Sequence, residues 1–251
     1  MDVYRRIKIT KNRGAEYFDV VDPVAVETKV RITVKGKELL SLSCTPSMVR
    51  ELITGFLLTE NIVPDAASAS AVSIQYGKYI FVELPADVMN GLPDLSRSLG
   101  GITVSREGTF RKKIKADITL PAASLKLVCR EFQNRSELFR LTGCFHSAAV
   151  SDGKRILAFA EDIGRHNAVD KAIGYAVLNN IPLKGMIMLV SCRVSSDIIS
   201  KCLRWDIPVL ASRAAPTELS IRIAEESGMT LIGFVRGDSM NIYTHPQRIR
   251  A

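Results

Sequence analysis

Short apolar runs alternate with amphipathic segments throughout the second half of the chain. The runs are bounded by Gly, Pro or polar residues, and they predict strands over 155–160, 185–190, 208–211, 230–235 and 239–244. The segments between them carry apolar residues at helical spacing and predict helices over 168–178, 196–204 and 217–227. Pro216 and Gly228 bracket the last of these helices, as N-terminal prolines and C-terminal glycines commonly do. The alternation indicates right-handed βαβ units and a largely parallel sheet.

Two shorter segments precede this series. Leu125, Val128 and Phe132 recur at helical spacing and predict an amphipathic helix that opens at Pro121. The apolar segment 146–150 is interpreted as a short helix.

The first half of the chain combines strand and helix patterns. Apolar and polar residues alternate over 29–35, which predicts a strand with one face in water. Apolar positions at helical spacing over 48–57 predict a helix capped by Thr45 or Ser47. The stretch 71–84 has turn residues at its centre and predicts a hairpin.

The composition shifts between the two halves. Residues 91–116 are rich in Gly and Ser and then basic, which is typical of a loop or an interdomain stretch. We therefore expect a smaller α+β domain over 1–116. We expect an α/β domain over 117–251, with helices on both faces of a mixed, largely parallel sheet.

Polar residues follow four of the predicted strands, at their carboxyl ends, where open α/β sheets bind ligands. Each of the four loops carries an arginine, and the candidate binding residues are Asp162, Arg165, His166, Asn167, Ser191, Arg193, Ser195, Ser196, Ser212, Arg213, Arg236, Asp238 and Ser239. One such loop means little, because loops are commonly polar. Four in succession favour a ligand with phosphate groups, since guanidinium forks and helix N-termini both bind anions. Asp162 and Asp238 are expected to contact a base or a ribose. Neither a Walker motif nor GxGxxG is present.

The overall composition narrows the class of protein. The chain has 251 residues, of which 47% are hydrophobic and 24% charged, and these fractions are typical of a globular protein. The net charge of +8 fits either a basic surface or an anionic partner. Aromatic residues make up only 6%, and no basic run is interleaved with them, so we do not expect nucleic-acid binding. No apolar run is long enough for a membrane span, and the N-terminal segment has no apolar stretch typical of a signal peptide. The five cysteines are irregularly spaced, which favours a reducing cytoplasm over a disulfide framework.

The cysteines and histidines supply further candidates. Cys144 and Cys192 are placed in turns beside basic groups at predicted helix N-termini, which would lower their pKa and expose a thiolate. The alternative for each is a small buried residue. His146 and His166 are either hydrogen-bonding residues or acid–base catalysts. No zinc is expected, because the chain has no CxxC motif and the segment after His146 lacks the carboxylate of nucleobase deaminases.

Five separated segments together resemble the FdhD/NarQ family: GFLLTENIV (55–63), DIGRHNAVDKAIG (162–174), SCRVSSDII (191–199), SRAAPTELSIRIAEESGMTLIGFVRGD (212–238) and NIYTHPQRI (241–249). The resemblance implies a cytoplasmic accessory protein of formate dehydrogenase. Such proteins take sulfur from a cysteine desulfurase as a persulfide and pass it to the molybdenum cofactor. The resemblance further implies binding of the cofactor's bis-guanine-dinucleotide form, for which a guanine nucleotide is a mimic, and a C-terminal domain like cytidine deaminase. The family's cofactor-binding segment falls on Phe234, Val235, Arg236, Gly237, Asp238 and Ser239.

The chain departs from the family at its persulfide motif. The family carries a C-G-x-C-G-type motif between its two halves, and the corresponding segment 97–103 of this chain has no cysteine. Two hypotheses follow. In the first, the sulfur-carrying thiol has moved to Cys144, beside His146, with Cys192 as the second candidate. In the second, the protein is a non-catalytic binder of the cofactor. Whether it is an enzyme stays open. A third hypothesis, an RNA-associated protein, rests on charge alone. A homodimer is expected only because C2 dimers are the commonest oligomers.

Overall fold

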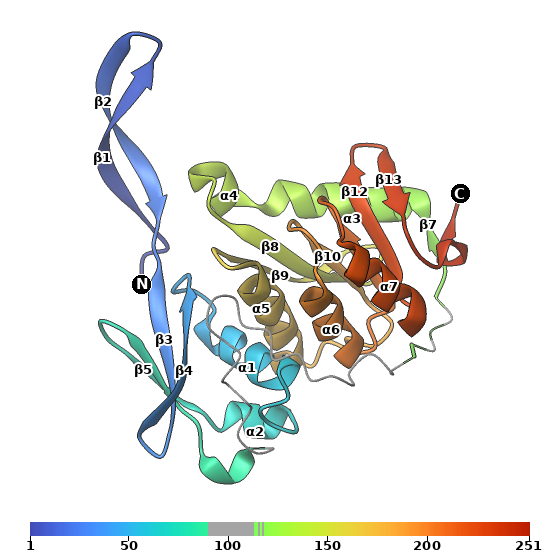
Figure 1. The fold of residues 1–251 in the computed structure, drawn as a ribbon, viewed down its shortest axis with the longest axis horizontal. Helices are drawn as coiled ribbons and strands as arrows, with labels where there is room; N and C mark the ends of the chain where they lie inside the picture. Colours follow the sequence, from blue (N-terminus) through green and yellow to red (C-terminus); the bar gives the residue numbers. More distant parts are fainter. Residues whose placement is uncertain (90–112, 115, 117) are drawn as a thin grey trace.

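The computed structural model describes residues 1–89, 113–114, 116 and 118–251. A six-stranded sheet forms the centre of the second half (Figure 1), and its strands in spatial order are β13 (Ser239–Ile242), β12 (Thr230–Arg236), β11 (Val209–Ser212), β10 (Ile187–Val190), β8 (His146–Ser151) and β9 (Ile156–Asp162). The pairs β10–β11 and β11–β12 are parallel, and the other three pairs are antiparallel. The expected mixed α/β fold is confirmed, although the sheet has fewer parallel pairs than expected, because only its two central pairs are parallel. Its likeness to cytidine deaminase stays a prediction.

Strand β8 corrects one expectation. The segment 146–150, expected to be a short helix, is a strand that pairs with both β9 and β10. Both of its faces are covered by the core, so Ala148, Ala149 and Val150 are all buried. A short, continuously apolar run has no period that separates a buried strand from a helix.

Helices cover both faces of this sheet (Figure 1), and they are α3 (Ala122–Arg135), α4 (Glu137–Thr142), α5 (Arg165–Leu178), α6 (Ser196–Arg204) and α7 (Glu218–Ser227). Met188 and Val190 of β10 join the core under α5, α6 and α7, whereas Ile187 and Leu189 join the core under α3. The strand is therefore apolar at every position, which is why its sequence shows no alternation. The expected helices are confirmed, although α5 begins three residues earlier than expected.

A second sheet organises the first half, with strand order β4 (Lys37–Cys44), β3 (Thr28–Val34), β6 (Ile80–Glu83) and β5 (Ser73–Tyr76). It packs with α1 (Val49–Thr59) and the short α2 (Ala66–Ser70). The expected strand and hairpin are confirmed. The expected cap of α1 is wrong: the N-cap is Met48, with no side-chain cap bond, because the Thr45 hydroxyl accepts a hydrogen bond from the backbone N–H of Ile163 instead.

The two halves meet through α1 and α5. A Cβ atom placed on Gly55 would lie 1.9 Å from the carbonyl oxygen of Asp170, and one on Gly174 would lie 1.9 Å from that of Glu51. Only glycine permits two helix backbones to approach this closely. The expected domain boundary at residue 116 stays a prediction, since most of residues 91–116 lie outside the described ranges.

Short elements complete the described chain. The strands β7 (Leu120–Pro121) and β14 (Ile249–Arg250) pair in parallel, so the end of the chain lies beside the start of the second half. The 3-10 turns η1 (Ala86–Val88) and η4 (Pro246–Arg248) follow β6 and precede β14. Across the described ranges, no helix is long and apolar enough to cross a membrane.

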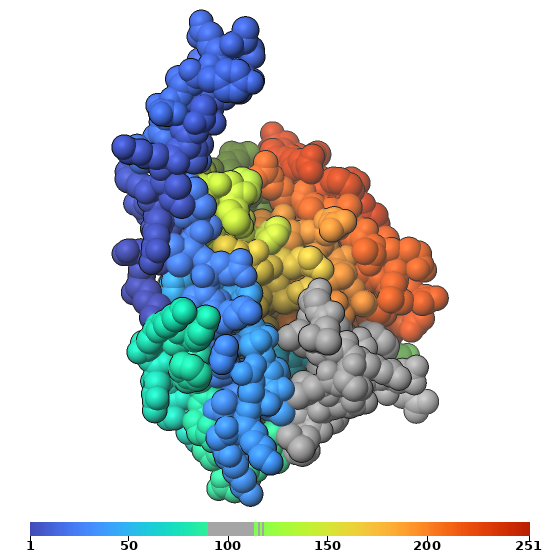
Figure 2. Space-filling view, turned by 60° about the vertical axis from the view of Figure 1, so that its left-hand side comes forward, coloured from blue at the N-terminus to red at the C-terminus, as the bar shows by residue number. Residues whose placement is uncertain are grey.

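The chain begins with a hairpin that the sequence analysis did not predict. Strands β1 (Tyr4–Arg13) and β2 (Glu16–Ala25) pair antiparallel in a two-stranded sheet of their own. Residues 4–25 are called the arm below. The arm extends beyond the rest of the molecule (Figures 1 and 2).

Candidate functional site

The predicted polar loops come together along one edge of the six-stranded sheet, called the loop edge below. Strand β9 ends and strand β8 begins at this edge, where His146 pairs in register with Asp162. The next strand, β10, ends beside β8: the backbone N–H of Ser147 donates to Ser191 Oγ at 2.9 Å. The position of His146 at the start of a strand, rather than in a helix, brings it to this edge.

The remaining loops continue the same row. The backbone N–H of Val194, after β10, donates to the carbonyl oxygen of Ala215, after β11, at 3.0 Å. Arg236, at the end of β12, donates through Nε to the carbonyl oxygen of Arg213 at 3.2 Å. Four inter-strand spacings separate β12 from β9, so the loop edge is about 19 Å long. That length suits an extended ligand.

Four arginines lie along the loop edge. Arg193, Arg213 and Arg236 are exposed, and Arg165 is half-buried in the first turn of α5. Their guanidinium groups suit phosphate oxygens, to which arginine presents two parallel N–H donors. The loop edge therefore carries the positive charge that the sequence analysis expected there.

The segment expected to bind the cofactor forms the turn between β12 and β13. Arg236 and Ser239 are a register pair across this turn, and Gly237 takes a left-handed φ of 54°. The Arg236 guanidinium lies 5.5 Å from the centre of the Phe234 ring, while Val235 is buried. The aromatic ring positions the guanidinium without consuming its N–H donors.

Asp162 has a different role from the one expected. Its side chain is fully buried and pairs with the buried ammonium of Lys171. It also accepts hydrogen bonds from the backbone N–H groups of Thr45 and Gly164, at 3.0 and 2.8 Å. A contact with a base or ribose would break these bonds, so Asp162 organises the loop from inside.

Two more of the expected binding residues form hydrogen bonds within the protein. Ser212 Oγ is buried, donates to the carbonyl oxygen of Cys192 at 2.6 Å and accepts from the Ala214 N–H at 2.9 Å. Asn167 Nδ2 donates to the Ser43 carbonyl at 2.8 Å. By contrast, the buried Ser195 Oγ has no hydrogen-bond partner among the described residues. Ser195 Oγ is therefore a polar atom whose hydrogen bonding the described residues leave unsatisfied.

Burial lowers the pKa of both histidines of the loop edge, which favours their neutral form. Burial lowers the pKa of His166 to about 4, and the cations Lys201 and Arg165 contribute to the shift. Its Nε2 lies 3.8 Å from a carboxylate oxygen of Asp197 and has no hydrogen-bond partner within the described part of the chain. Burial, together with Arg165, also lowers the pKa of His146. Neutral imidazoles accept protons and hydrogen bonds.

The five cysteines fall into two groups. Cys44, Cys129, Cys192 and Cys202 are buried, and burial raises the pKa of each thiol, to about 11 for Cys192. Of the two alternatives for Cys192, the small buried residue is confirmed and the exposed, acidic thiol is wrong. Cys144 is exposed, so its buried alternative is wrong, but it follows the C-terminal end of α4 rather than starting a helix. Exposure alone makes it the accessible thiol.

A buried charge network behind the loop edge was missed. Lys201 of α6 donates to Asp170 of α5 at 2.9 Å and to Glu60, which follows α1, at 2.7 Å. Thr59 also donates to Asp170, at 2.7 Å. The signal was a lysine at a helix position that the apolar period assigns to the core. No three His, Cys, Asp or Glu side chains gather as metal ligands in the ranges that the structure describes.

One known family matches most of the chain. The model of the FdhD/NarQ family matches residues 25–250. The chain belongs to the FdhD/NarQ family. This match covers every loop of the loop edge, and the resemblance expected from the sequence is confirmed.

Similar proteins of the FdhD/NarQ family align over nearly their whole length. Sulfur carrier protein FdhD of Geobacillus kaustophilus is 34% identical, over 98% of this chain and 97% of its own. The protein of the same name from Bacillus subtilis is 33% identical, over 94% and 93%. A solved structure from Desulfotalea psychrophila, named as a formate dehydrogenase accessory protein, matches with a TM-score of 0.82 and 26% identity, covering 99% of this chain and 100% of that one. The segment 97–103, on which the resemblance predicts the family's cysteine motif, lies outside the described residues.

Proposed function

We propose that this chain is an accessory protein of formate dehydrogenase that carries sulfur on Cys144 to a guanine-dinucleotide form of the molybdenum cofactor bound along the loop edge. One observation carries the proposal. The exposed thiol of the chain, at Cys144, lies two residues before the strand that brings His146 to the loop edge. The partners in this proposal are the catalytic subunit of formate dehydrogenase, a cysteine desulfurase and a second copy of the chain, all in the cytoplasm.

The residues of the loop edge fit such a cofactor. Its pyrophosphate groups match the exposed guanidinium groups of Arg193, Arg213 and Arg236. Ser195 Oγ and His166 Nε2, both without hydrogen-bond partners among the described residues, provide polar contacts that a ligand would complete. When bound, the molybdenum centre is the acceptor of the sulfur. The protein supplies the binding surface and the thiol.

Sulfur loading is a thiol–persulfide exchange that needs no oxidant or reductant. The Cys144 thiolate attacks the terminal sulfur of a persulfide on the donor protein. The new S–S bond forms on Cys144 as the donor's S–S bond breaks, and the donor cysteine leaves as a thiolate. His146, two residues along the chain, is the base that accepts the Cys144 proton before the attack, since burial lowers its pKa and so favours the neutral imidazole.

The test is the intact mass of the protein after incubation with a cysteine desulfurase and free cysteine. We expect wild type to gain one sulfur atom that a reductant removes, and Cys144→Ser to gain none. The control Cys129→Ala removes a buried thiol and keeps the gain. A gain that persists in Cys144→Ser would place the sulfur elsewhere and contradict the proposal.

A second candidate function is cofactor binding without sulfur transfer. It is favoured by the lack of cysteine over 97–103, where relatives with the family motif carry their persulfide. Calorimetric titration with GDP, as a mimic of the guanine nucleotide, separates the two functions on the same preparation. GDP binding together with no sulfur gain at any thiol would support the second function. A protein that neither binds GDP nor gains sulfur would contradict both functions.

A further inference from the structure

Helix α4, which leads directly to Cys144, is capped by a residue from another element. Its own N-cap residue, Ser136, makes no side-chain cap bond. Instead, Oε2 of Glu161, at the end of β9, accepts a hydrogen bond from the backbone N–H of Leu138 at 3.4 Å. The first N–H groups of a helix have no partner within the helix, so this bond satisfies one of them. Glu161 therefore ties the start of α4 to the six-stranded sheet.

A chain of hydrogen bonds runs from this cap to Cys144. The carbonyl oxygen of Leu138 accepts a hydrogen bond from the Thr142 hydroxyl at 2.9 Å. The same hydroxyl oxygen accepts one from the backbone N–H of Cys144 at 3.2 Å. Gly143, between them, takes a left-handed φ of 72°, and its N–H donates to the carbonyl oxygen of Phe139 at 2.7 Å. The backbone of Cys144 is therefore held in place although its side chain is exposed.

Glu161 also reaches the strand that carries His146. Its Oε1 accepts a hydrogen bond from the buried Ser136 hydroxyl at 2.7 Å, and the Ser136 and Ser147 hydroxyl oxygens lie 2.8 Å apart. A hydroxyl donates one hydrogen, so Ser136 donates to the carboxylate and Ser147 donates to Ser136. Ser147 directly follows His146 in β8 and is the register partner of Glu161. One carboxylate therefore organises both segments that flank Cys144.

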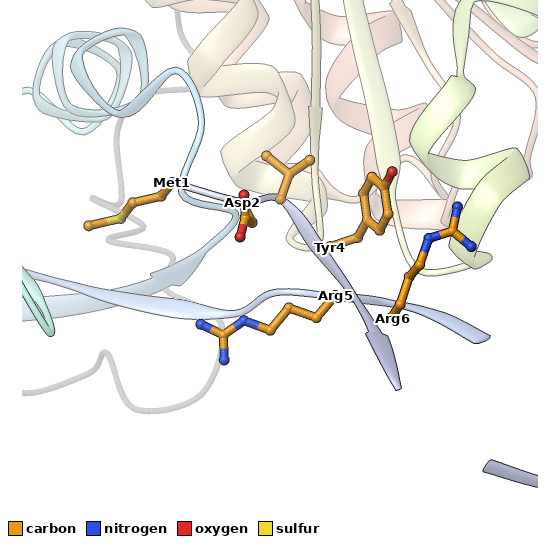
Figure 3. Close-up of a pocket in the computed structure, with 6 residues that line it drawn as sticks. Met1, Asp2, Tyr4, Arg5 and Arg6 are labelled. Carbon is orange, nitrogen blue, oxygen red and sulfur yellow. The ribbon is translucent and has the colours of Figure 1, made fainter. Parts of the chain in front are cut away.

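The arm gives α4 little support from the other side. Helix α4 lies beside β2, but Phe139 and Leu141 of the helix are still 43% and 41% exposed. At the root of the arm, residues 1–6 line an open hollow of about 680 Å³ (Figure 3), with Tyr4 and Arg6 pointing towards the helices of the body. The arm therefore packs loosely here. The position of α4 depends on its hydrogen bonds to the sheet.

We propose that Glu161 and Thr142 are positioning residues for sulfur loading, which hold the Cys144 thiol in the orientation in which it attacks the donor persulfide. This inference rests on the proposed function, in which Cys144 carries the sulfur. Glu161 acts through α4 and Ser147, and Thr142 acts through the backbone N–H of Cys144. A reacting group that is already oriented saves the entropy cost of ordering it during the reaction. The two residues therefore contribute to the rate of sulfur transfer and not to binding of the donor.

The test is the rate at which Cys144 gains sulfur from an excess of persulfidated cysteine desulfurase, followed by intact mass over time. A series of donor concentrations gives the limiting loading rate and the concentration that produces half of it. Thr142→Val keeps the branched shape of the side chain and removes its hydroxyl. We expect its limiting rate to fall about ten-fold, with the half-saturating donor concentration unchanged. Thr142→Ser retains the hydroxyl and should load at close to the wild-type rate.

Glu161→Gln tests the anchor in β9 independently. A carboxamide has one acceptor oxygen in place of two, so it cannot accept from both Leu138 and Ser136 as the carboxylate does. We expect a similar fall in the limiting loading rate. The matched control is Glu131→Gln on α3, which breaks an ion pair with Arg135 at a side chain that is 42% exposed. This control should load at the wild-type rate.

Far-UV circular dichroism and alkylation of Cys144 by iodoacetamide verify that each variant is folded and exposes its thiol. Wild-type limiting rates in both Thr142→Val and Glu161→Gln would overturn the positioning role and leave sulfur loading on Cys144 intact. A change confined to the half-saturating donor concentration would also overturn it, because the two residues would then belong to the surface that binds the donor. If wild type gains no sulfur on Cys144, the proposed function fails and this inference fails with it.

Discussion

Lys201 Nζ donates hydrogen bonds to both carboxylate oxygens of Asp170, each at 2.9 Å, in a site from which water is excluded. Burial alone lowers the pKa of the Lys201 ammonium, but the carboxylates of Asp170 and Glu60 outweigh burial and raise it above its ordinary value. The lysine is therefore charged in the folded protein. Because Glu60 follows α1 and Asp170 lies on α5, one ammonium group ties three helices together behind the loop edge.

Replacing this ammonium should be strongly destabilising. Lys201→Met leaves two buried carboxylates without a cation, and we expect a loss of about 3–5 kcal/mol in the free energy of unfolding. Urea denaturation measures this loss in the free energy of unfolding. The control Arg135→Met breaks an ion pair with Glu131 in which both side chains are over 40% exposed, and it should cost less than about 0.5 kcal/mol. Equal losses in both variants would contradict the role of the buried network.

The contact between α1 and α5 should not tolerate a methyl group. Gly55→Ala places its Cβ against the Asp170 carbonyl oxygen, so the helices must separate, and we expect a loss of about 3 kcal/mol. Gly77→Ala is the control, since its nearest neighbour would lie 3.6 Å from the new Cβ and its φ is not left-handed. Thermal unfolding compares the two. A Gly55→Ala protein as stable as Gly77→Ala would show that the helices are not tightly packed.

His166 should make stability depend on pH in mildly acidic solution. Its pKa is about 4 when folded and about 6.5 when unfolded, so below pH 6.5 the unfolded chain binds a proton that the folded protein does not. Stability is therefore full above pH 6.5 and falls as the pH drops towards 4, by up to about 3 kcal/mol. His166→Gln should show a shallower fall in this range when unfolding is measured in urea at several pH values. Parallel curves for the two proteins would exclude His166 as the cause.

Arg236 should contribute to nucleotide affinity. Arg236→Ala removes a charge-assisted contact, and we expect GDP binding to weaken by about 1–3 kcal/mol, roughly five- to 150-fold in Kd. Titration calorimetry measures the change. Arg155→Ala is the matched control, because Arg155 is 78% exposed in the turn between β8 and β9, at the opposite end of these strands. Unchanged affinity in Arg236→Ala would remove this arginine from the binding site.

The local pattern predicted most of the second half and less of the first. Helix α6 begins and ends where its periodicity places it, at Ser196 and Arg204. The arm was missed even though Ile7 and Ile9 alternate with charged residues over β1, as they do in a strand. The run 146–150 was misread because a strand buried on both faces has no alternation.

The sequence by itself determined the order of strands and helices from β9 to β13, the presence of an arginine after each of four strands, and the family to which the chain belongs. These features depend on neighbouring residues, whose spacing follows directly from the period of each element. Only the tertiary structure decided that Asp162 is buried against Lys171, that Cys192 is inaccessible, and that Lys201 reaches Glu60 across 141 positions of sequence. Burial and long-range pairing are properties of the packed chain, because they arise from elements that local periodicity does not bring together.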